Sequence, residues 1–443
     1  MKKSIIKCLA LLLSVLLCTS AFTACGADSG KPAGEKPAAG EPTKEKAAQK
    51  VTLTLLANQD WTNKPYMKAA WKNYEDKTGN KLDIQAVPID SGEQVMKTKF
   101  ATGEIPDVFM HFGGNGLDPF QPEKNFFDMS GEKWVSDIKD FALFQVKFKD
   151  KIYGLPLWEG TVSGLLYNKE IFTKLNISIP KTQTEFLAAC ETLKSNNIIP
   201  IYMGFKDVWP IFPQFALDSI FKDPDLMGKL NSNQTKYADV KEFNDMLNFY
   251  KMLADKGYLG EKFSTNTFDG QARALGEGKY AMCYSWDGFL TTDVEPKYPG
   301  TSAKFGIMPS FLGANEEGSY EGPNACMTFA CKTGKNAEAA KAFVNFLAEP
   351  ENLNLAYKDQ PTQTYFKSVN TNKPSEQYTE AKDSVDRLML SSYAWAGIIG
   401  FDQVEMVKPI QELMLGSKTV EETARAMDDV RMKSAKAQKA PGF

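Results

Sequence analysis

From residue 51 onward, short apolar runs alternate with segments of helical periodicity, and this alternation is the strongest constraint on the fold. Buried strands are predicted at 51–57 (VTLTLLA), 81–89 (KLDIQAVPI) and 107–112 (DVFMHF). Between them, Met67 to Tyr74 places apolar side chains three and four residues apart before Gly79, and 93–102 also predicts a helix. A strand-helix-strand-helix-strand order predicts a largely parallel sheet with helices on its faces.

The same alternation continues through the rest of the chain. Strands are predicted at 154–157, 164–168, 198–204, 279–285, 304–309 and 326–332. Helices are predicted after Thr182, which forms a capping box with Glu185, at 239–256, at 336–348 before Pro350, at 404–415, and after Thr419 with Glu422. About 390 residues are too many for one usual core, so we expect two α/β lobes with a cleft between them. Ligands of such folds bind between the lobes, beyond strand ends.

The N-terminus has the order of a secretory signal peptide. Three lysines precede the apolar run 9–17, and the small-residue stretch Ala21-Phe22-Thr23-Ala24 ends at Cys25. A cysteine in this position resembles the lipobox of bacterial lipoproteins, whose thiol is acylated, with palmitate for example, after residues 1–24 are removed. Phe22 departs from the Leu that is usual three residues before that cysteine. An ordinary secreted protein cleaved after Ala24, or an uncleaved anchor, is the alternative.

Residues 25–50 are expected to form the lipid anchor and a flexible tether. After Cys25 this segment contains only small, polar and charged residues and proline, so it has too little apolar surface to offset the entropy of ordering. No second run of about 18 apolar residues follows, which predicts a body that is soluble outside the cytoplasm.

Composition excludes several classes of function. Removal of residues 1–24 takes away three lysines and no acid, so the formal charge changes from −3 to −6, which argues against nucleic acid as a partner. His111 is the only histidine, so zinc clusters and Ser-His-Asp triads are not expected; it falls in a predicted strand and is interpreted as a core residue. No metal and no cofactor are predicted. Cys190, Cys283, Cys326 and Cys331 match no metal motif and are interpreted as buried thiols rather than a disulfide.

Four segments together resemble the family 1 extracellular solute-binding proteins, the sugar-type receptor lipoproteins of ABC importers. They are Gly103-Glu104-Ile105-Pro106-Asp107-Val108 after the first strands; Tyr153-Gly154-Leu155-Pro156 followed by Leu165-Leu166-Tyr167-Asn168-Lys169; Gly278-Lys279-Tyr280-Ala281-Met282 followed by Trp286; and Gln411-Glu412-Leu413 with Gly416 and Thr419-Val420-Glu421-Glu422. Each segment alone is weak evidence for the family. The four segments together occur in the order typical of the family and span nearly the whole mature chain.

The resemblance implies a two-lobed periplasmic-binding-protein-like fold of type II, each lobe a mixed sheet flanked by helices. The first lobe is expected to consist of 51–157 plus 328–362, and the second of 158–327 plus 363–443. The implied partners are a carbohydrate, ABC permease subunits and, through Cys25, the membrane. We expect a monomer outside the cytoplasm of a single-membrane, Gram-positive bacterium, since a tether would keep the receptor near its permease.

Sugar rings need flat aromatic side chains to cover their C–H faces and amides or carboxylates to bind their hydroxyls. Trp71 lies on a helix face and is predicted to be core. Residues after strands or in irregular stretches are the ligand-binding candidates: Trp286 with Asp287, Trp158 with Glu159, Trp61 with Asp60, Trp209, Trp395 with Tyr393, and Asn115 in a glycine-rich turn. That turn lacks the Gly-Lys-Ser/Thr ending of a phosphate loop.

Two functions compete at this point. A receptor captures its ligand by hinge closure and performs no chemistry, so no catalytic residue is assigned. A tethered polysaccharide-active hydrolase would need two carboxylates facing each other across the scissile bond, and Asp60, Glu159 and Asp287 are the acids near the expected cleft. No catalytic motif accompanies these acids, so a receptor is favoured over a hydrolase. Its ligand is expected to be a neutral rather than a charged oligosaccharide.

Overall fold

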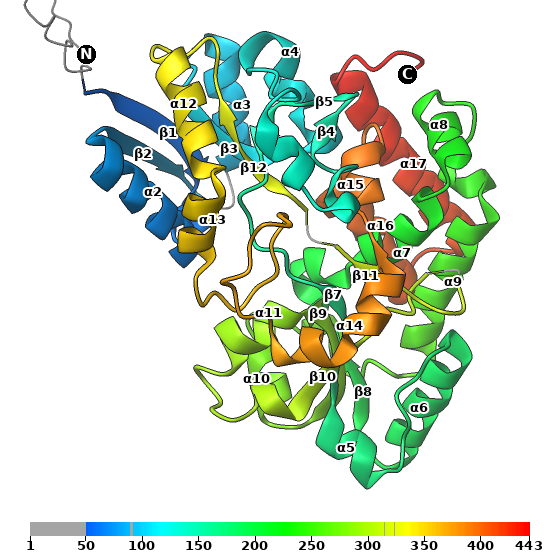
Figure 1. Ribbon diagram of the computed structural model, residues 1–443. Coiled ribbons are helices and arrows are strands. Elements are labelled where there is room, and N and C mark those ends of the chain that lie inside the picture. The colour runs from blue at the N-terminus through cyan, green and yellow to red at the C-terminus, as the bar shows by residue number, and fades with distance from the viewer. Residues whose placement is uncertain (1–49, 89–91, 314, 323) are drawn as a thin grey trace, which may run out of the picture. The chain divides into compact units, whose positions relative to one another are not determined.

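A computed structural model describes residues 50–88, 92–313, 315–322 and 324–443. The predicted signal peptide, Cys25 and the tether up to residue 49 lie outside the described residues, as does Ile89 at the end of the second predicted strand. Two large sheets, each covered by its own helices, organise the described part of the chain (Figure 1).

The first sheet has the strand order β2-β1-β3-β12-β6. Its strands are β1 (Thr52–Asn58), β2 (Lys81–Val87), β3 (Val108–Phe112), β6 (Gly154–Leu155) and β12 (Cys326–Ala330). Strand β1 pairs in parallel with β2 and β3, whereas β12 runs antiparallel to β3 and β6. The sheet with its helices is called the first lobe below; the helices are α1 (Gln59–Thr62), α2 (Pro65–Thr78), α3 (Gly92–Thr102), α4 (Pro122–Asn125), α12 (Ala337–Leu347) and α13 (Pro350–Tyr357).

The second sheet has the order β13-β11-β7-β9-β8, with β10 also paired to β7. Its strands are β7 (Ser163–Asn168), β8 (Ile199–Tyr202), β9 (Tyr280–Trp286), β10 (Phe305–Met308), β11 (Tyr320–Glu321) and β13 (Met389–Leu390). This sheet and its helices are called the second lobe. The helices are α5 (Lys169–Lys174), α6 (Gln183–Ser195), α7 (Pro213–Phe221), α8 (Pro224–Asn231), α9 (Lys241–Asp255), α10 (Gln271–Gly276), α11 (Asp287–Phe289), α14 (Glu376–Leu388), α15 (Tyr393–Gly397), α16 (Gln403–Met414) and α17 (Val420–Ala437).

Local sequence signals set several helix ends as predicted. Gly79 has φ +70° and ends α2, because a left-handed residue is needed there and glycine adopts it without steric cost. The hydroxyl of Thr182 accepts a hydrogen bond from the Glu185 backbone N–H at the start of α6, while the Glu185 carboxylate accepts from the Lys181 N–H at 2.7 Å, so only half of the predicted capping box forms. Thr419 and Glu422 form the reciprocal capping box of α17.

Helix α12 ends at Leu347, before Pro350, as predicted. Pro350 itself occupies the first turn of the additional helix α13, where its missing N–H costs no helical hydrogen bond. The C-terminal part of the chain contains α14 and α15 in addition to the two predicted helices. Helix α14 has mostly charged and polar residues, but Tyr378, Ala381, Val385 and Leu388 lie three and four residues apart and pack against the core of the second lobe.

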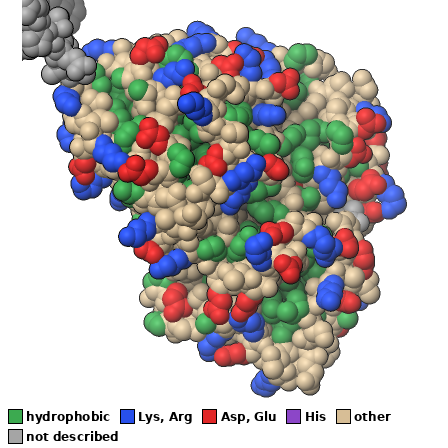
Figure 2. All heavy atoms as spheres, viewed as in Figure 1, with side chains coloured by type: hydrophobic (Ala, Val, Ile, Leu, Met, Phe, Trp, Pro, Cys, Tyr) green, Lys and Arg blue, Asp and Glu red, His purple; other side chains and the backbone are tan. Residues whose placement is uncertain are grey.

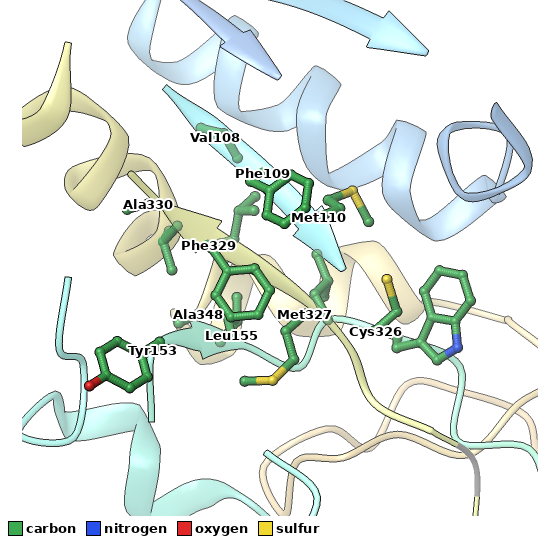
Figure 3. Packing of buried hydrophobic residues seen from close by; sticks show 14 of the residues in the cluster. Val108, Phe109, Met110, Tyr153, Leu155, Cys326, Met327, Phe329, Ala330 and Ala348 are labelled. Carbon is green, nitrogen blue, oxygen red and sulfur yellow. The ribbon is translucent and has the colours of Figure 1, made fainter. Parts of the chain in front are cut away.

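The core of the first lobe lies against both faces of its sheet. Phe109 of β3 and Phe329 of β12 are paired in register, with ring centroids 6.1 Å apart, and Leu155 of β6 packs in the same cluster (Figure 3). Trp71 is 4% exposed in this cluster, which confirms its predicted core position. His111 is 6% exposed and is hydrogen-bonded at both ring nitrogens, which confirms its interpretation as a core residue.

The chain passes between the lobes at neighbouring segments. The Gly160 N–H donates to the carbonyl of Gln363 at 2.7 Å, and a Cβ on Gly160 would approach that oxygen to 2.9 Å. The Tyr357 hydroxyl donates to the carbonyl of Trp158 at 2.6 Å. Tyr365 belongs to the core cluster of the first lobe although it lies in a segment that was assigned to the second. Two crossing segments therefore lie side by side.

Acidic and basic side chains are mixed over the surface shown in Figure 2, as the nearly balanced composition requires. Within the described ranges, no helix combines the length and the apolar character that crossing a membrane requires. The same residues contain no group of three or more His, Cys, Asp or Glu side chains arranged to hold a metal ion. Cys190, Cys283, Cys326 and Cys331 are buried thiols.

Candidate functional site: an aromatic cavity between the lobes

A cavity of about 380 Å³ is lined by residues of both lobes. The first lobe contributes Phe112, the last residue of β3, and Trp158, which follows β6. The second lobe contributes most of the wall, from the ends of β9 and β11, from the start of α7 and from α15 and α16. These lining residues are Ser163, Trp209, Phe212, Gln214, Phe215, Trp286, Glu321, Gly322, Asn324, Trp395 and Gln403.

Four of the five tryptophans proposed from the sequence line this cavity. Trp286 ends β9, Trp209 follows β8 and Trp395 lies in α15, so three of the rings come from the second lobe. The ring of Phe268 stacks under Trp286, with centroids 6.0 Å apart, and it also contacts Trp209 at 4.5 Å. The aromatic wall is therefore supported from behind by another ring.

A strained turn holds Trp209 in place. Val208 has φ +69° and ψ −68°, and Phe212 has φ +51°, so non-glycine residues on both sides of the Trp209-Pro210-Ile211 turn adopt positive φ angles. A β-branched residue with positive φ is a rare and costly conformation, and such strain concentrates at functional sites. The turn brings both Trp209 and Phe212 to the cavity.

The fifth tryptophan, Trp61, lies in a second row. Its ring meets those of Phe112 and Trp158 edge to face, with centroids 5.3 and 6.2 Å apart, and it does not itself line the cavity. Asp60, its neighbour, is exposed. Trp61 can therefore fix the orientation of the two first-lobe rings that do line the cavity.

The predicted polar partners lie around the cavity rather than in it. Glu159 pairs with Lys64 at 2.6 Å, and the Lys64 ammonium sits 5.5 Å from the centre of the Trp158 ring, a cation–π distance. Asp287 is buried and accepts hydrogen bonds from the Val162 N–H at 2.9 Å and the Ser375 hydroxyl at 2.6 Å. Burial raises the pKa of the Asp287 carboxyl, and these hydrogen bonds oppose the rise.

Asn115 and Tyr393 make contacts between the lobes. The Asn115 amide donates to the carbonyl of Gly397 in α15 at 2.9 Å. The Tyr393 ring packs against Phe144, with centroids 4.8 Å apart, and burial raises the pKa of its hydroxyl. Neither residue lines the cavity.

The polar groups that do line the cavity were missed by sequence reasoning. Gln403 donates to Gln214 at 3.1 Å, which brings two amides together at the aromatic wall. The amide oxygen of Asn324 is buried without a partner among the described residues. Phe112 offered a signal, since it ends a predicted strand, whereas the amides belong to segments with no pattern that marks them.

The arrangement suits a ligand with both apolar faces and hydroxyl groups, because aromatic rings and amide groups lie side by side. Two hollows of about 520 and 550 Å³ are larger, but they are lined mostly by charged and polar residues and by no tryptophan. The interlobe cavity is therefore the better candidate for a specific organic ligand.

Comparison with known proteins agrees with this geometry. Residues 59–353 match the family described as bacterial extracellular solute-binding protein. The multiple sugar-binding protein of Streptococcus mutans is 24% identical over 352 residues, which are 75% of this chain and 80% of that protein.

Solved structures share the fold. A putative binding protein of Bacillus subtilis in an open conformation has a TM-score of 0.73 and 17% identity, over 88% of this chain and 99% of that one. A solute-binding protein in complex with raffinose has a TM-score of 0.68 and 17% identity, over 88% of this chain and all of the other. The predicted two-lobed type II α/β fold is thus confirmed. The chain belongs to the family of bacterial extracellular solute-binding proteins, which are binding proteins rather than enzymes.

Proposed function

We propose that this protein is the receptor of an ABC importer and captures an oligosaccharide between its lobes by hinge closure. The observation that carries the proposal is the cavity lined by four tryptophans from both lobes, with amide groups beside them. A ligand that contacts both lobes stabilises the closed state by its differential affinity for that state. The relative from Streptococcus mutans is named for binding multiple sugars, which supports a carbohydrate as the ligand.

The lobes are proposed to be 51–157 plus 328–362 and 158–327 plus 363–443, with small shifts near the crossings. The ligand-binding residues are proposed to be Trp158, Trp209, Trp286 and Trp395, supported by Trp61 and by the Glu159–Lys64 pair. Permease subunits are the proposed protein partners of a monomeric receptor. The rival hydrolase is not favoured, because none of Asp60, Glu159 and Asp287 lines the cavity, and Glu321, the acid among the described lining residues, has no second lining carboxylate facing it.

The sequence around Cys25 supports a lipid anchor in the cell membrane of a Gram-positive bacterium. The full chain, expressed in such a host, should fractionate with membranes and incorporate labelled palmitate. Cys25→Ser should appear in the medium or as an unprocessed precursor, without label. Labelling of the Cys25→Ser protein would contradict acylation at this residue.

Ligand capture can be tested with protein that lacks residues 1–25. A panel of neutral oligosaccharides is titrated by calorimetry and by tryptophan fluorescence, and the sugar is analysed afterwards. We expect binding of at least one oligosaccharide with a fluorescence change, a raised melting temperature and an unchanged sugar. Trp286→Ala should weaken that binding with little loss of stability. Release of reducing ends would instead establish a hydrolase.

A further inference from the structure

Glu321 is an acidic residue in the wall of the cavity without a cationic partner. It ends β11, paired with Ser163 of β7 and with Leu390 of β13, and it is 6% exposed. No ion pair between described residues includes it, and no hydrogen bond from a described residue reaches its carboxyl group. A buried carboxylate in such surroundings is costly unless it takes up a proton.

A second buried acid interacts with Glu321 from α7. Asp218 is 1% exposed, and its Oδ1 accepts a hydrogen bond from the backbone N–H of Ala394 at 2.7 Å. Its Oδ2 is buried without a partner among the described residues. Burial raises the pKa of both carboxyl groups, and the charge of Asp218 raises that of Glu321 further.

The other groups that face Glu321 are neutral. Tyr250 of α9 and Tyr365, which follows α13, interact electrostatically with it, and burial raises the pKa of both hydroxyls, so neither is ionised near neutral pH. The paired residues of β7 and β13 are Ser163 and Leu390, which carry no charge. The pair of acids therefore has no cation to balance two negative charges.

The backbone decides which acid keeps its charge. Asp218 receives a hydrogen bond from a main-chain N–H at the start of α15, and an N–H donor stabilises the ionised form. Glu321 has no comparable donor among the described residues. The main-chain donor therefore favours the ionised form of Asp218 over that of Glu321, while burial raises the pKa of both carboxyl groups.

We propose that Glu321 stands in the cavity as a neutral carboxylic acid, with Asp218 carrying the single negative charge, and donates a hydrogen bond to an oxygen of an uncharged sugar. This inference rests on the proposed function for the identity of the ligand. It also gives the substrate class: a sugar that carries a carboxylate would bring a second negative charge near buried Asp218, and no Lys or Arg is among the described residues that line the cavity, so neutral oligosaccharides are selected over uronic acids.

Two variants test the proposal in binding experiments. Glu321→Gln keeps a donor and an acceptor and should bind a neutral oligosaccharide within about twofold of the unaltered protein. Glu321→Leu removes the donor and should bind about tenfold more weakly. If Glu321 were an ionised acceptor, Glu321→Gln would replace a charge-assisted hydrogen bond by a neutral one and bind clearly more weakly than the unaltered protein, and this result would overturn the proposal. Tighter binding of galacturonic acid oligomers than of their neutral counterparts would also overturn it.

A measurement on the free protein separates this inference from the proposed function. Protein labelled with ¹³C at the glutamate carboxyl is compared with the Glu321→Gln variant by NMR. The signal that is missing from Glu321→Gln belongs to Glu321, and in the unaltered protein it should lie at the position of a protonated carboxyl at pH 7. In Asp218→Asn the Glu321 signal should titrate at a lower pH than in the unaltered protein. A Glu321 signal at the ionised position would reject the inference whether or not any sugar binds. Failure of every sugar to bind, with a protonated signal, would reject only the proposed function.

Discussion

The ring of Phe112, the last residue of β3, lies 6.0 Å from the ring of Trp395 in α15, so the two lobes make an aromatic contact at the cavity wall. Trp395 is also supported by Phe401, with centroids 5.6 Å apart. A ligand that seats between the lobes must meet this pair of rings. The contact therefore links the conformation of the lobes to the occupancy of the cavity.

Trp395→Ala should weaken oligosaccharide binding about tenfold or more, because it removes one ring face from the cavity. The free energy of unfolding should fall by only about 1–2 kcal/mol, since the side chain is half-buried and few core contacts are lost. Calorimetric titration and urea unfolding measure the two effects.

The matched control is Trp134→Ala. Trp134 is 8% exposed in the first-lobe core and donates to the Asn345 side chain at 3.0 Å. This variant should lose stability without losing affinity. Equal affinity of Trp395→Ala and the unaltered protein would remove Trp395 from the binding site.

Asp107 joins three segments of the first lobe. Its carboxylate accepts hydrogen bonds from the N–H and hydroxyl of Thr54 at 3.0 and 3.1 Å, and from the N–H and amide of Asn336 at 2.7 and 3.1 Å. Burial alone would raise the pKa of Asp107, but these donors outweigh it and hold the pKa below its ordinary value. Asp107→Asn should therefore lower the free energy of unfolding by about 2 kcal/mol or more at pH 7, because an NH₂ group would face donors.

The pH dependence of this effect has a definite sign. A carboxyl whose pKa is lower in the folded state contributes stability above its unfolded pKa of about 3.9, and this contribution is lost as the pH falls below that value. The difference between Asp107→Asn and the unaltered protein should thus shrink from pH 7 to pH 3 in urea unfolding. Asp140→Asn serves as control, since Asp140 is exposed and its pair with Lys367 should contribute little. A difference that is constant with pH would contradict the assigned role.

The contact between Glu93 and His111 is a second feature whose contribution to stability should depend on pH. The Nε2 of His111 lies 2.8 Å from Glu93, and its Nδ1 lies 3.1 Å from the Phe112 carbonyl, so both ring nitrogens face acceptors. Burial tends to raise the pKa of Glu93, but His111 and Lys97 outweigh this and lower it to about 2. Glu93→Gln should reduce stability at pH 7 by about 1 kcal/mol or less, because the Glu93 side chain is half exposed and screened by solvent.

The loss caused by Glu93→Gln should be present above pH 4.5 and disappear as the pH falls toward 2, since the lowered pKa makes the carboxylate contribute only where it is ionised. Thermal unfolding at several pH values measures it. Glu104→Gln is the control, since Glu104 is exposed and its ion pair with Lys99 at 3.2 Å should contribute little. A stabilising effect of Glu93→Gln at pH 7 would show that burial dominates.

Much of the fold could be predicted because its signals are local. The alternation in residues 51–57, the cap at Gly79 and the capping box at Thr419 depend on neighbours in sequence, and all three appear in the structure. Helix α14 was missed although Tyr378, Ala381, Val385 and Leu388 form a regular apolar stripe, because charged and polar residues make up most of the rest of its sequence.

The candidate site was only partly predictable, for a physical reason. Trp158, Trp209 and Trp286 were predicted from their positions at or after strand ends, and all three line the cavity. The same criterion cannot distinguish a ring that faces the cavity from one behind it, such as Trp61. The acids show the same limit. Glu321 and Asp218 interact only because α7 packs beside β11, and nothing in either local sequence indicates the other.

Gly114 of the first lobe lies directly against α15 of the second lobe. It has φ +64°, and a Cβ there would lie 2.5 Å from the Cα of Ala396 in α15. The next residue, Asn115, donates to the carbonyl of Gly397. Gly114→Ala must therefore either strain the backbone or push α15 away from the first lobe.

We expect Gly114→Ala to lower the free energy of unfolding by about 2 kcal/mol and also to weaken ligand binding, because displacement of α15 separates Trp395 from Phe112. Gly116→Ala is the matched control from the same turn, since the nearest atom to its Cβ would be 4.0 Å away. Urea unfolding and calorimetric titration of both variants measure the effects. Indistinguishable behaviour of the two variants would mean that the contact between the turn and α15 does not position Trp395, and binding would then depend on the second-lobe wall alone.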